Sequence, residues 1–366
     1  MNYICFMKLT LQIKLLPSES QADSLKNTLI ECNKVCNIIS DIAFTNKMFN
    51  QFKLHHACYH IIRNNFNLSA QLVVRCISKV IDSYKIDRKV KRTYKPLGSI
   101  AYDSRILTYQ NDKVSISSVD GRLKMPFICH NQNYFPYIKG EADLVYRKGK
   151  FYLFQTVDIP DTEVKDVEEF IGCDFGITDI CVTSDKIIYN NTQLNNVREK
   201  YFKVRKSLQR KGTKGTKKVL KRLSGREKRF QTITNHTISK QIVQSAKKQK
   251  KGIAIEDLKG IRFTTKVRKE QRRKHNAWAF YQLRQFIEYK SKLNGVPVIA
   301  VRPNYTSKTC NNCKHIGIRN GKDFKCNNCG YTNDADFNAS LNISAMGISV
   351  MYPEKSTMYC ALRHAS

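Results

Sequence analysis

Apolar residues alternate with polar ones at the start of the chain and then change to a helical spacing. The alternation over residues 3–16 predicts a half-buried strand. Pro17 and the following Ser18-Glu19-Ser20-Gln21 predict a turn and a helix capping box. From there to about Lys85, apolar residues return every three or four positions, with separate helices expected over Gln51 to Asn64 and from Ser69 onward. The N-terminal part is therefore one strand followed by a helical module.

The apolar spacing returns to two between residues 98 and 160. Asn111-Asp112, Asp120-Gly121 and Lys148-Gly149 are typical turn pairs between such strands. We expect a small β-barrel or sheet that also takes in the first strand, which makes the helical module an insertion. From Glu169 onward strands alternate with helices, which is the pattern of an α/β domain.

Charge narrows the class of partner. The 366 residues contain 64 Lys and Arg against 30 Asp and Glu, a net charge of +34. The 41% of hydrophobic residues excludes wholesale disorder, and so large a positive charge is unlike an enzyme of small metabolites and indicates a polyanion. Residues 201–280 hold 26 basic and 4 acidic side chains, so 26 − 4 = +22 of the excess lies there.

The basic stretch over residues 197–250 has a helical pattern. Two helices joined at residues 211–215 would form a basic arm suited to phosphates. The alternative is a solvated face, which fits less well because the like charges would repel one another. The sequence VRKSLQRKGTKGTKKVLKRL is too polar for a membrane-bound helix. The candidate nucleic-acid-binding residues are Lys203, Arg205, Lys206, Arg210, Lys211, Lys214, Lys217, Lys218, Lys221, Arg222 and, further on, Lys308.

Membrane insertion and secretion are not expected. No apolar run reaches the ~18 residues of a membrane-spanning helix, and the N-terminus has no signal-peptide pattern. We expect a reducing compartment, the cytoplasm with its nucleoid or the nucleus of a eukaryotic host. Nine of the 13 cysteines are scattered and are interpreted as small buried apolar residues rather than as disulfides.

The other four cysteines form two pairs, Cys310-x2-Cys313 and Cys326-x2-Cys329. Each pair presents two thiolates to one ion, and two such pairs complete a tetrahedral zinc site. Because all four positions are taken by protein, the single Zn²⁺ is expected to be structural. Four unrelated free thiols would rarely have this spacing.

Three carboxylates follow or open apolar segments in the C-terminal half. Asp174 ends the segment FIGCD, Glu256 ends GIAIE, and Asp336 opens a predicted helix after the cysteines. Singly, each fits a cap or turn residue, and Asp257 and Asp334 are neighbouring alternatives. Together they predict a site where two Mg²⁺ ions about 4 Å apart hydrolyse phosphodiesters.

With these motifs the sequence resembles TnpB, the OrfB protein of bacterial insertion sequences. The resemblance extends over nearly the whole chain, from an N-terminal segment through the acids to the cysteines. The segments that carry it are KLLPSESQADSLKNTLIECNKVCNIIS, LSAQLVVRCISKVIDSYK, LVYRKGKFYLF, IGCDFGITDI, LSGREKRFQTITNHTISKQIV, IAIEDLKGIR, YTSKTCNNC, FKCNNCGY and DADFNASLNI.

The resemblance implies an RNase H-like nuclease domain of RuvC type with an inserted four-cysteine zinc ribbon, beside a wedge β-barrel that a helical recognition module interrupts. It assigns Asp174, Glu256 and Asp336 to the metal ions and Cys310, Cys313, Cys326 and Cys329 to zinc. The implied domains are the wedge barrel (1–16 and 88–162), the recognition helices (17–87), the nuclease domain with its basic arm (163–309), the zinc ribbon (310–330) and the rest of the nuclease domain with the tail (331–366).

In this family the protein is an RNA-guided DNA endonuclease, similar to the ancestor of type V CRISPR effectors. The implied partners are a guide RNA from the transposon end and a double-stranded DNA target, bound by a monomer, with a dimer as the open alternative. Two other functions stay open: a transposase that joins strands and a guided DNA-binding protein without cleavage. Four residues before the ribbon are candidates for contact with the cut strand, with a loop that merely enters the first cysteine pair as the open alternative: Tyr305, Thr306, Ser307 and Lys308. Asn338 is a candidate to orient Asp336, to hold a phosphate or to cap a turn.

Overall fold

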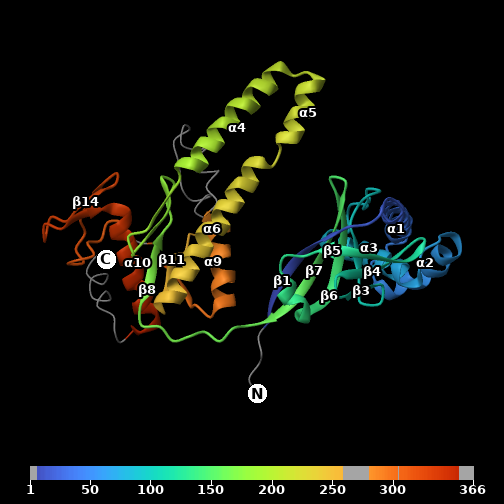
Figure 1. The fold of residues 1–366 in the computed structure, drawn as a ribbon, viewed down its shortest axis with the longest axis horizontal. Helices are drawn as coiled ribbons and strands as arrows, with labels where there is room; N and C mark the ends of the chain where they lie inside the picture. The colour runs from blue at the N-terminus through green and yellow to red at the C-terminus, as the bar shows by residue number, and fades with distance from the viewer. Residues whose placement is uncertain (1–5, 259–279, 304, 354–366) are drawn as a thin grey trace. The chain divides into compact units, whose positions relative to one another are not determined.

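The computed structural model describes residues 6–258, 280–303 and 305–353, in two compact units, Met1–Pro160 and Asp161–Ser366 (Figure 1). The first unit contains β1 (Phe6–Leu15), α1 (Glu19–Thr45), α2 (Gln51–Asn65), α3 (Ala70–Ile86), β2 (Ile100–Tyr102), β3 (Leu107–Gln110), β4 (Lys113–Ser118), β5 (Gly121–Ile128), the 3-10 helix η1 (Gln132–Tyr137), β6 (Ile138–Arg147) and β7 (Lys150–Pro160).

The strands of the first unit form one antiparallel, nearly closed barrel sheet in the order β2-β6-β7-β1-β5-β4-β3. Strand β1 lies between β7 and β5, which confirms that the first strand belongs to the sheet and that α1–α3 are an insertion. The predicted turns are present, and Asn111, Gly121, Lys148 and Gly149 have positive φ angles there.

The three helices of the insertion start as the sequence predicts. Ser18 and Gln21 form the capping box of α1, and the Ser69 side chain caps α3. The helices pack through buried apolar residues, among which Cys32, Cys36 and Cys76 are fully enclosed. Seven of the nine scattered cysteines are described; six are buried and Cys129 is half-buried, while Cys5 and Cys360 lie outside the described residues.

The second unit is built on a five-stranded sheet in the order β10-β9-β8-β11-β12, with β8, β11 and β12 parallel. Helices α6 and α9 cover one face and α10 covers the other (Figure 1). Its elements are β8 (Phe170–Asp174), β9 (Asp179–Thr183), β10 (Ile188–Asn190), α4 (Thr192–Lys211), α5 (Lys214–Leu223), α6 (Arg226–Gln249), β11 (Gly252–Glu256), α9 (Phe280–Asn294), β12 (Val298–Val301), β13 (Ile318–Asn320), β14 (Asp323–Lys325), β15 (Thr332–Asp334) and α10 (Ala335–Met351).

Alternation along the central strands decides which side chains face which helices. In β8, Ile171 and Cys173 belong to the core under α6 and α9, whereas Phe170 belongs to the core under α10. In β11, Ile253 and Ile255 face α6 and α9 in the same way. Because successive side chains of a strand point to opposite faces, the residues that end these strands point toward α10.

The basic stretch forms a helical arm that projects from the sheet (Figure 1). The sequence predicts two helices joined at residues 211–215, but the structure has three, α4, α5 and α6. The predicted joint is the break between α4 and α5, where Gly212 has a φ of 63°. A second break follows α5 at Ser224 and Gly225, where Gly225 has a φ of 78° that favours glycine.

A small three-stranded antiparallel sheet, β13-β14-β15, carries the second cysteine pair and leads into α10. Phe324 is its largest buried side chain, and it packs with Cys310, Cys326 and Ala335. Within the described parts of the chain, no helix has both the length and the apolar character needed to cross a membrane.

Candidate active site

Asp174 and Glu256 are neighbours because their strands are. Strands β8 and β11 are parallel, and their last paired residues are Cys173 and Ile255. Asp174 and Glu256 each follow directly, at the same end of the sheet and on the face toward α10. The local sequence therefore brings two carboxylates together from positions 82 residues apart.

Asp336 joins them from the first turn of α10. The Asp334 side chain is the N-cap of this helix and accepts hydrogen bonds from the backbone N–H groups of Asp336 and Phe337, both at 2.9 Å. Asp334, the neighbouring alternative to Asp336, therefore caps α10. Helix α10 runs close against β8, since a methyl group at Gly172 would lie 2.0 Å from the Ser340 carbonyl oxygen.

The charges of Glu256 and Asp336 act on Asp174. Burial, followed by the charges of Glu256 and Asp336, raises the pKa of Asp174 well above its usual range. Burial also raises the pKa of Glu256 and of Asp336. Within the described residues, the four cysteines converge as a metal-binding group, and the three acids are not among such groups. Buried, mutually repelling carboxylates are nevertheless a ligand set that suits hard divalent cations such as Mg²⁺.

Arg319 of β13 is the cation of this site, and sequence reasoning missed it. Its guanidinium pairs with the Asp336 carboxylate at 2.7 Å. The same positive charge lowers the pKa of all three acids, Asp174, Glu256 and Asp336, against the effect of burial. No local pattern marks Arg319 among the other basic residues, because its position follows from how the small sheet folds back on α10.

Thr306 lies beside Glu256. Its hydroxyl donates a hydrogen bond of 2.5 Å to the Glu256 carboxylate, and both residues are buried. This contact lowers the pKa of Glu256, again opposing the effect of burial. The sequence offers Thr306 as a contact for the cut strand, whereas the structure uses its hydroxyl within the acid site. Lys308, its neighbour, is exposed.

Two buried asparagines of α10 hold the loop that contains Thr306. Asn338 donates to the Thr309 carbonyl at 2.8 Å and accepts from the Asn311 N–H at 3.0 Å. This matches the turn-holding alternative for Asn338. Asn342, which the sequence pattern did not single out, donates to the carbonyls of Thr306 and Thr309. The spacing of four residues that puts both amides on one helix face is the signal that could have found it.

Asp257, the neighbouring alternative to Glu256, has a different partner. Its carboxylate accepts a 2.5 Å hydrogen bond from Arg284 of α9, which also pairs with Glu288. Asp257 follows Glu256 directly, and its contact with α9 lies on the side of the sheet opposite α10. It is therefore separated from the three acids, as strand alternation predicts.

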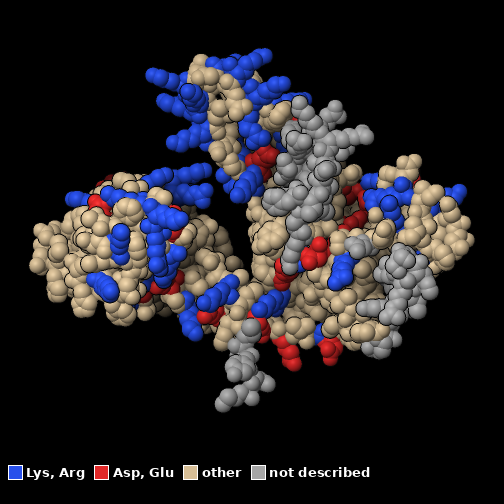
Figure 2. Space-filling view, turned by 180° about the vertical axis from the view of Figure 1, so that it is seen from behind, with Lys and Arg blue, Asp and Glu red and all other residues tan. Residues whose placement is uncertain are grey.

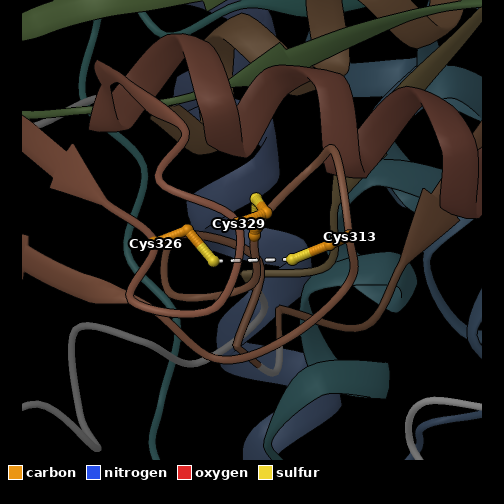
Figure 3. A group of neighbouring side chains, drawn as sticks. Cys313, Cys326 and Cys329 are labelled. Atoms are coloured by element: carbon orange, nitrogen blue, oxygen red, sulfur yellow. Dashed lines mark hydrogen bonds between the residues drawn. The ribbon is translucent and has the colours of Figure 1, made fainter.

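The four paired cysteines form one cluster, and their sulfurs all lie within 4.8 Å of one another. Cys313 and Cys326 are 3.5 Å apart (Figure 3), and Cys310 and Cys329 are 3.7 Å apart. The backbone N–H of His315 donates to Cys313 and lowers the pKa of its thiol to about 5. Four converging sulfurs, one of them readily ionised, fit a tetrahedral structural Zn²⁺.

The small sheet connects this cluster to the acid site. Lys322, between β13 and β14, pairs with buried Asp179 at the start of β9. Its carbonyl accepts a hydrogen bond from the N–H of Ala335, the first residue of α10. Arg319 adds the contact to Asp336. The sheet that the cysteines hold together thus borders the carboxylates directly.

The basic side chains of the arm gather on its surface (Figure 2). All ten candidates predicted on α4 and α5 are exposed. Within the described residues only Arg205 has a carboxylate partner, Glu227 at 2.8 Å. The remaining nine charges lack such a partner, which makes the arm a strong attractor of anions.

The chain is similar to several known proteins. The family model for the Cas12f1-like TNB domain matches residues 280–343. A CRISPR-associated endodeoxyribonuclease Cas12f1 of Sulfoacidibacillus thermotolerans is 33% identical over 230 residues, 57% of this chain and 53% of that one. The TnpB-like protein MJ0751 of Methanocaldococcus jannaschii is 37% identical over 174 residues, 45% of this chain and 63% of that one. The matches thus span roughly half to two thirds of these relatives.

A solved structure shares the fold over a longer range. A cryo-EM structure of a Cas12f1–sgRNA–target DNA complex aligns with a TM-score of 0.57 over 90% of this chain and 83% of that one, at 17% identity. The sequence relatives, the matching TNB domain model and this common fold agree with the resemblance seen in the sequence. The chain is therefore related to the TnpB-like proteins and to the type V effectors of the Cas12f kind.

Proposed function

We propose that this protein is an RNA-guided DNA endonuclease of a transposable element, which hydrolyses DNA phosphodiesters with two divalent metal ions held by Asp174, Glu256 and Asp336. The observation that carries the proposal is the meeting of these three acids at one end of the β8–β11 pair, under α10. The charges of Glu256 and Asp336 raise the pKa of Asp174, and this repulsion favours a bound cation.

The second unit is best explained as an RNase H-like domain of RuvC type with a zinc ribbon at residues 310–330. Its support is the mixed sheet with helices on both faces and the four-cysteine cluster before α10. We assign residues 1–16 and 88–162 to a wedge barrel and 17–87 to recognition helices. The similarity in fold to Cas12f1 supports this division.

Metal ions bound to the three acids would supply an activated water and stabilise the leaving oxygen. The residues of this chain provide the rest. Thr306 favours the ionised form of Glu256 by donating to it, and Asp334 caps the first turn of α10, which carries Asp336. Arg319 reduces the repulsion among the carboxylates. The structural Zn²⁺ would hold the small sheet that carries Arg319.

The proposed partners are a guide RNA and a double-stranded DNA target. The exposed, unpaired basic side chains of α4 and α5 supply phosphate contacts, and Lys308 supplies one beside the acid site. The names of the Cas12f1 relative and of the Cas12f1–sgRNA–target DNA complex describe such activity and partners for those proteins. We propose a monomer with RNA, acting at the nucleoid, or in the nucleus of a eukaryotic host.

The test begins with the RNA. The protein is purified from cells that carry its native flanking DNA, and the RNA that comes with it is sequenced. A discrete RNA ending in sequence from beyond the gene is expected, and it then guides cleavage of matching duplex DNA with Mg²⁺. Asp174→Ala should keep the RNA and abolish cleavage. Cleavage by this variant, or strand joining in place of hydrolysis, would overturn the proposal.

A further inference from the structure

A cluster of aromatic and basic side chains lies on the outer side of α6 and α9, away from the acids and the arm candidates. The inner sides of these helices pack on the sheet through residues such as Ile242 and Ile287. On the outer side, the rings of His236 and Phe286 are stacked with centroids 3.8 Å apart and planes 17° apart. Tyr289 contacts Phe286 edge-on at 6.0 Å.

A lysine lies over these rings. The Lys290 ammonium is 5.8 Å from the Phe286 ring centroid and 5.9 Å from that of Tyr289. It donates to the His236 carbonyl at 2.6 Å and to the Ser239 hydroxyl at 2.7 Å. These contacts fix the ammonium in place, yet none of them neutralises its charge.

The cluster carries positive charge that the protein does not balance. In the described part of the chain, neither Lys290 nor nearby Lys240 has a carboxylate partner. Burial and the charge of Lys240 lower the pKa of Lys290 to about 8, so it is still mostly protonated at neutral pH. Burial and the charge of Lys290 also lower the pKa of His236, so its ring is neutral there. A neutral exposed ring beside two unbalanced cations suits a ligand that is both flat and anionic.

We propose that His236, Phe286 and Lys290, with Lys240, form a binding site for an unpaired stretch of nucleic acid. A base would stack on the His236–Phe286 pair while a neighbouring phosphate is held by Lys290 and Lys240. The bases of a duplex are already stacked and paired, so the site selects single strands. The proposal rests on the nucleic-acid-binding part of the proposed function and is independent of cleavage.

The charge and the ring geometry of the cluster favour nucleic acid over protein as its ligand. A protein partner would have to offer an acid and an aromatic side chain together, whereas every nucleotide offers both groups at fixed spacing. His236 and Lys240 lie on α6, the third helix of the basic arm, so a strand bound along the arm has a path toward the cluster. An unpaired part of the guide RNA and an unwound DNA strand have the same chemistry, and the test separates them.

Three labelled 20-mers serve as probes without guide or metal: dT20, rU20 and an abasic strand with the same number of phosphates. Binding is measured for wild type, His236→Ala, Lys290→Gln and the control Lys292→Gln, whose ammonium on the same helix already pairs with Asp161. His236→Ala should weaken binding to dT20, rU20 or both about fivefold or more, without changing abasic binding. Lys290→Gln should weaken all three, and Lys292→Gln should change none.

A preferential loss with rU20 would assign the site to guide RNA, and one with dT20 to unwound DNA. Unchanged binding of both strands by His236→Ala, or an equal loss on the abasic strand, would overturn the stacking site. His236→Tyr, which keeps a stacking ring, guards against a folding artefact and should bind like wild type. Ultraviolet crosslinking of wild type to the strand whose binding is lost, with 4-thiouridine in rU20 or 4-thiothymidine in dT20, should label α6 or α9 peptides, and labelling confined to other peptides would count against the site. Absence of guided cleavage would leave these binding results unaffected.

Discussion

The Thr306 hydroxyl donates a 2.5 Å hydrogen bond to the Glu256 carboxylate across 50 positions of the chain. Thr306→Val removes the donor while keeping the shape of the side chain. Because the hydrogen bond lowers the pKa of Glu256, its removal raises that pKa further and makes the carboxylate a poorer metal ligand at neutral pH. We expect a loss of roughly 10–100-fold in metal affinity.

Two measurements check the role of Thr306. Mn²⁺ titration followed by calorimetry gives the affinity, and the pH dependence of cleavage should have its acidic limb moved to higher pH in Thr306→Val. Thr306→Ser keeps the hydroxyl and is the matched control. If Thr306→Val binds Mn²⁺ as tightly as wild type and the acidic limb of its cleavage profile is unmoved, the hydroxyl serves only the packing of the loop.

The raised pKa of Asp174 predicts a cost to stability at neutral pH. A carboxyl group whose pKa rises on folding adds stability below its ordinary pKa of about 4 and loses it as the pH rises through the folded value. Asp174→Asn removes the charge and should melt higher than wild type at pH 7 in EDTA, by ~2–4 °C for each kcal/mol relieved. The difference should shrink toward pH 4.

Mg²⁺ should raise the Tm of wild type at pH 7 and leave Asp174→Asn nearly unchanged. Asp23→Asn, a change at an exposed carboxylate of α1, is the control for removal of one negative charge. A Tm for Asp174→Asn that stays below wild type at every pH would contradict the idea that the acids repel one another.

Arg319 is expected to compete with metal ions. Its charge lowers the pKa of Asp174, Glu256 and Asp336, so Arg319→Gln should lower the metal-free Tm at pH 7 more than at pH 5. Because the Arg319 guanidinium and Mn²⁺ are both positive, removing the guanidinium should also strengthen Mn²⁺ binding. We expect a gain of about two- to tenfold, in line with the modest energies of partly exposed ion pairs. Arg319→Lys keeps the charge and should resemble wild type in both measurements. Weaker Mn²⁺ binding by Arg319→Gln would refute the competition.

Removal of zinc should affect the acid site through the small sheet. The four cysteines predict one Zn²⁺ per chain, measurable by plasma mass spectrometry, and Cys326→Ser should reduce that content. Without the ion, the small sheet loses its support, and with it the Lys322 carbonyl that accepts a hydrogen bond from Ala335 at the start of α10, so Asp336 is held less firmly beside Asp174. We therefore expect Mn²⁺ binding at the acids to weaken as zinc is chelated, while the helical content of the first unit stays constant. If Mn²⁺ binding is unaltered after all the zinc is chelated, the acid site does not depend on the four-cysteine cluster.

The arm predicts a salt dependence. Lys217→Gln and Lys218→Gln together should reduce the slope of log K against log salt for duplex DNA by about 0.9 for each phosphate that the arm no longer neutralises. Lys26 and Lys85 already pair with Asp23 and Asp82, so their replacement by Gln is the control for removal of two positive charges. An equal slope change in both double variants would make the arm merely part of the general surface charge.

The sequence predicted the elements better than the contacts between them. The alternation of β1, the capping box at Ser18 and the cysteine spacing are local, and the structure confirms each of them. The ends of β8 and β11 also predicted where acids would meet. The positions of Arg319, Thr306 and Asn342 could not be predicted, because each contact joins segments whose approach depends on how the small sheet β13-β14-β15 and α10 fold. The second break in the arm was missed although Ser224-Gly225 marks it.

Gly172 has a consequence for how related genes are interpreted. Helix α10 touches β8 there without an intervening side chain, so even alanine would push the helix outward and carry Asp336 away from Asp174. A related protein with alanine at this position would keep every acid and every cysteine. A comparison of motifs alone would therefore not distinguish it from an active protein. Whether such a protein can bring its acids together depends on having a hydrogen atom rather than a methyl group at residue 172, although this residue has no role in the reaction itself.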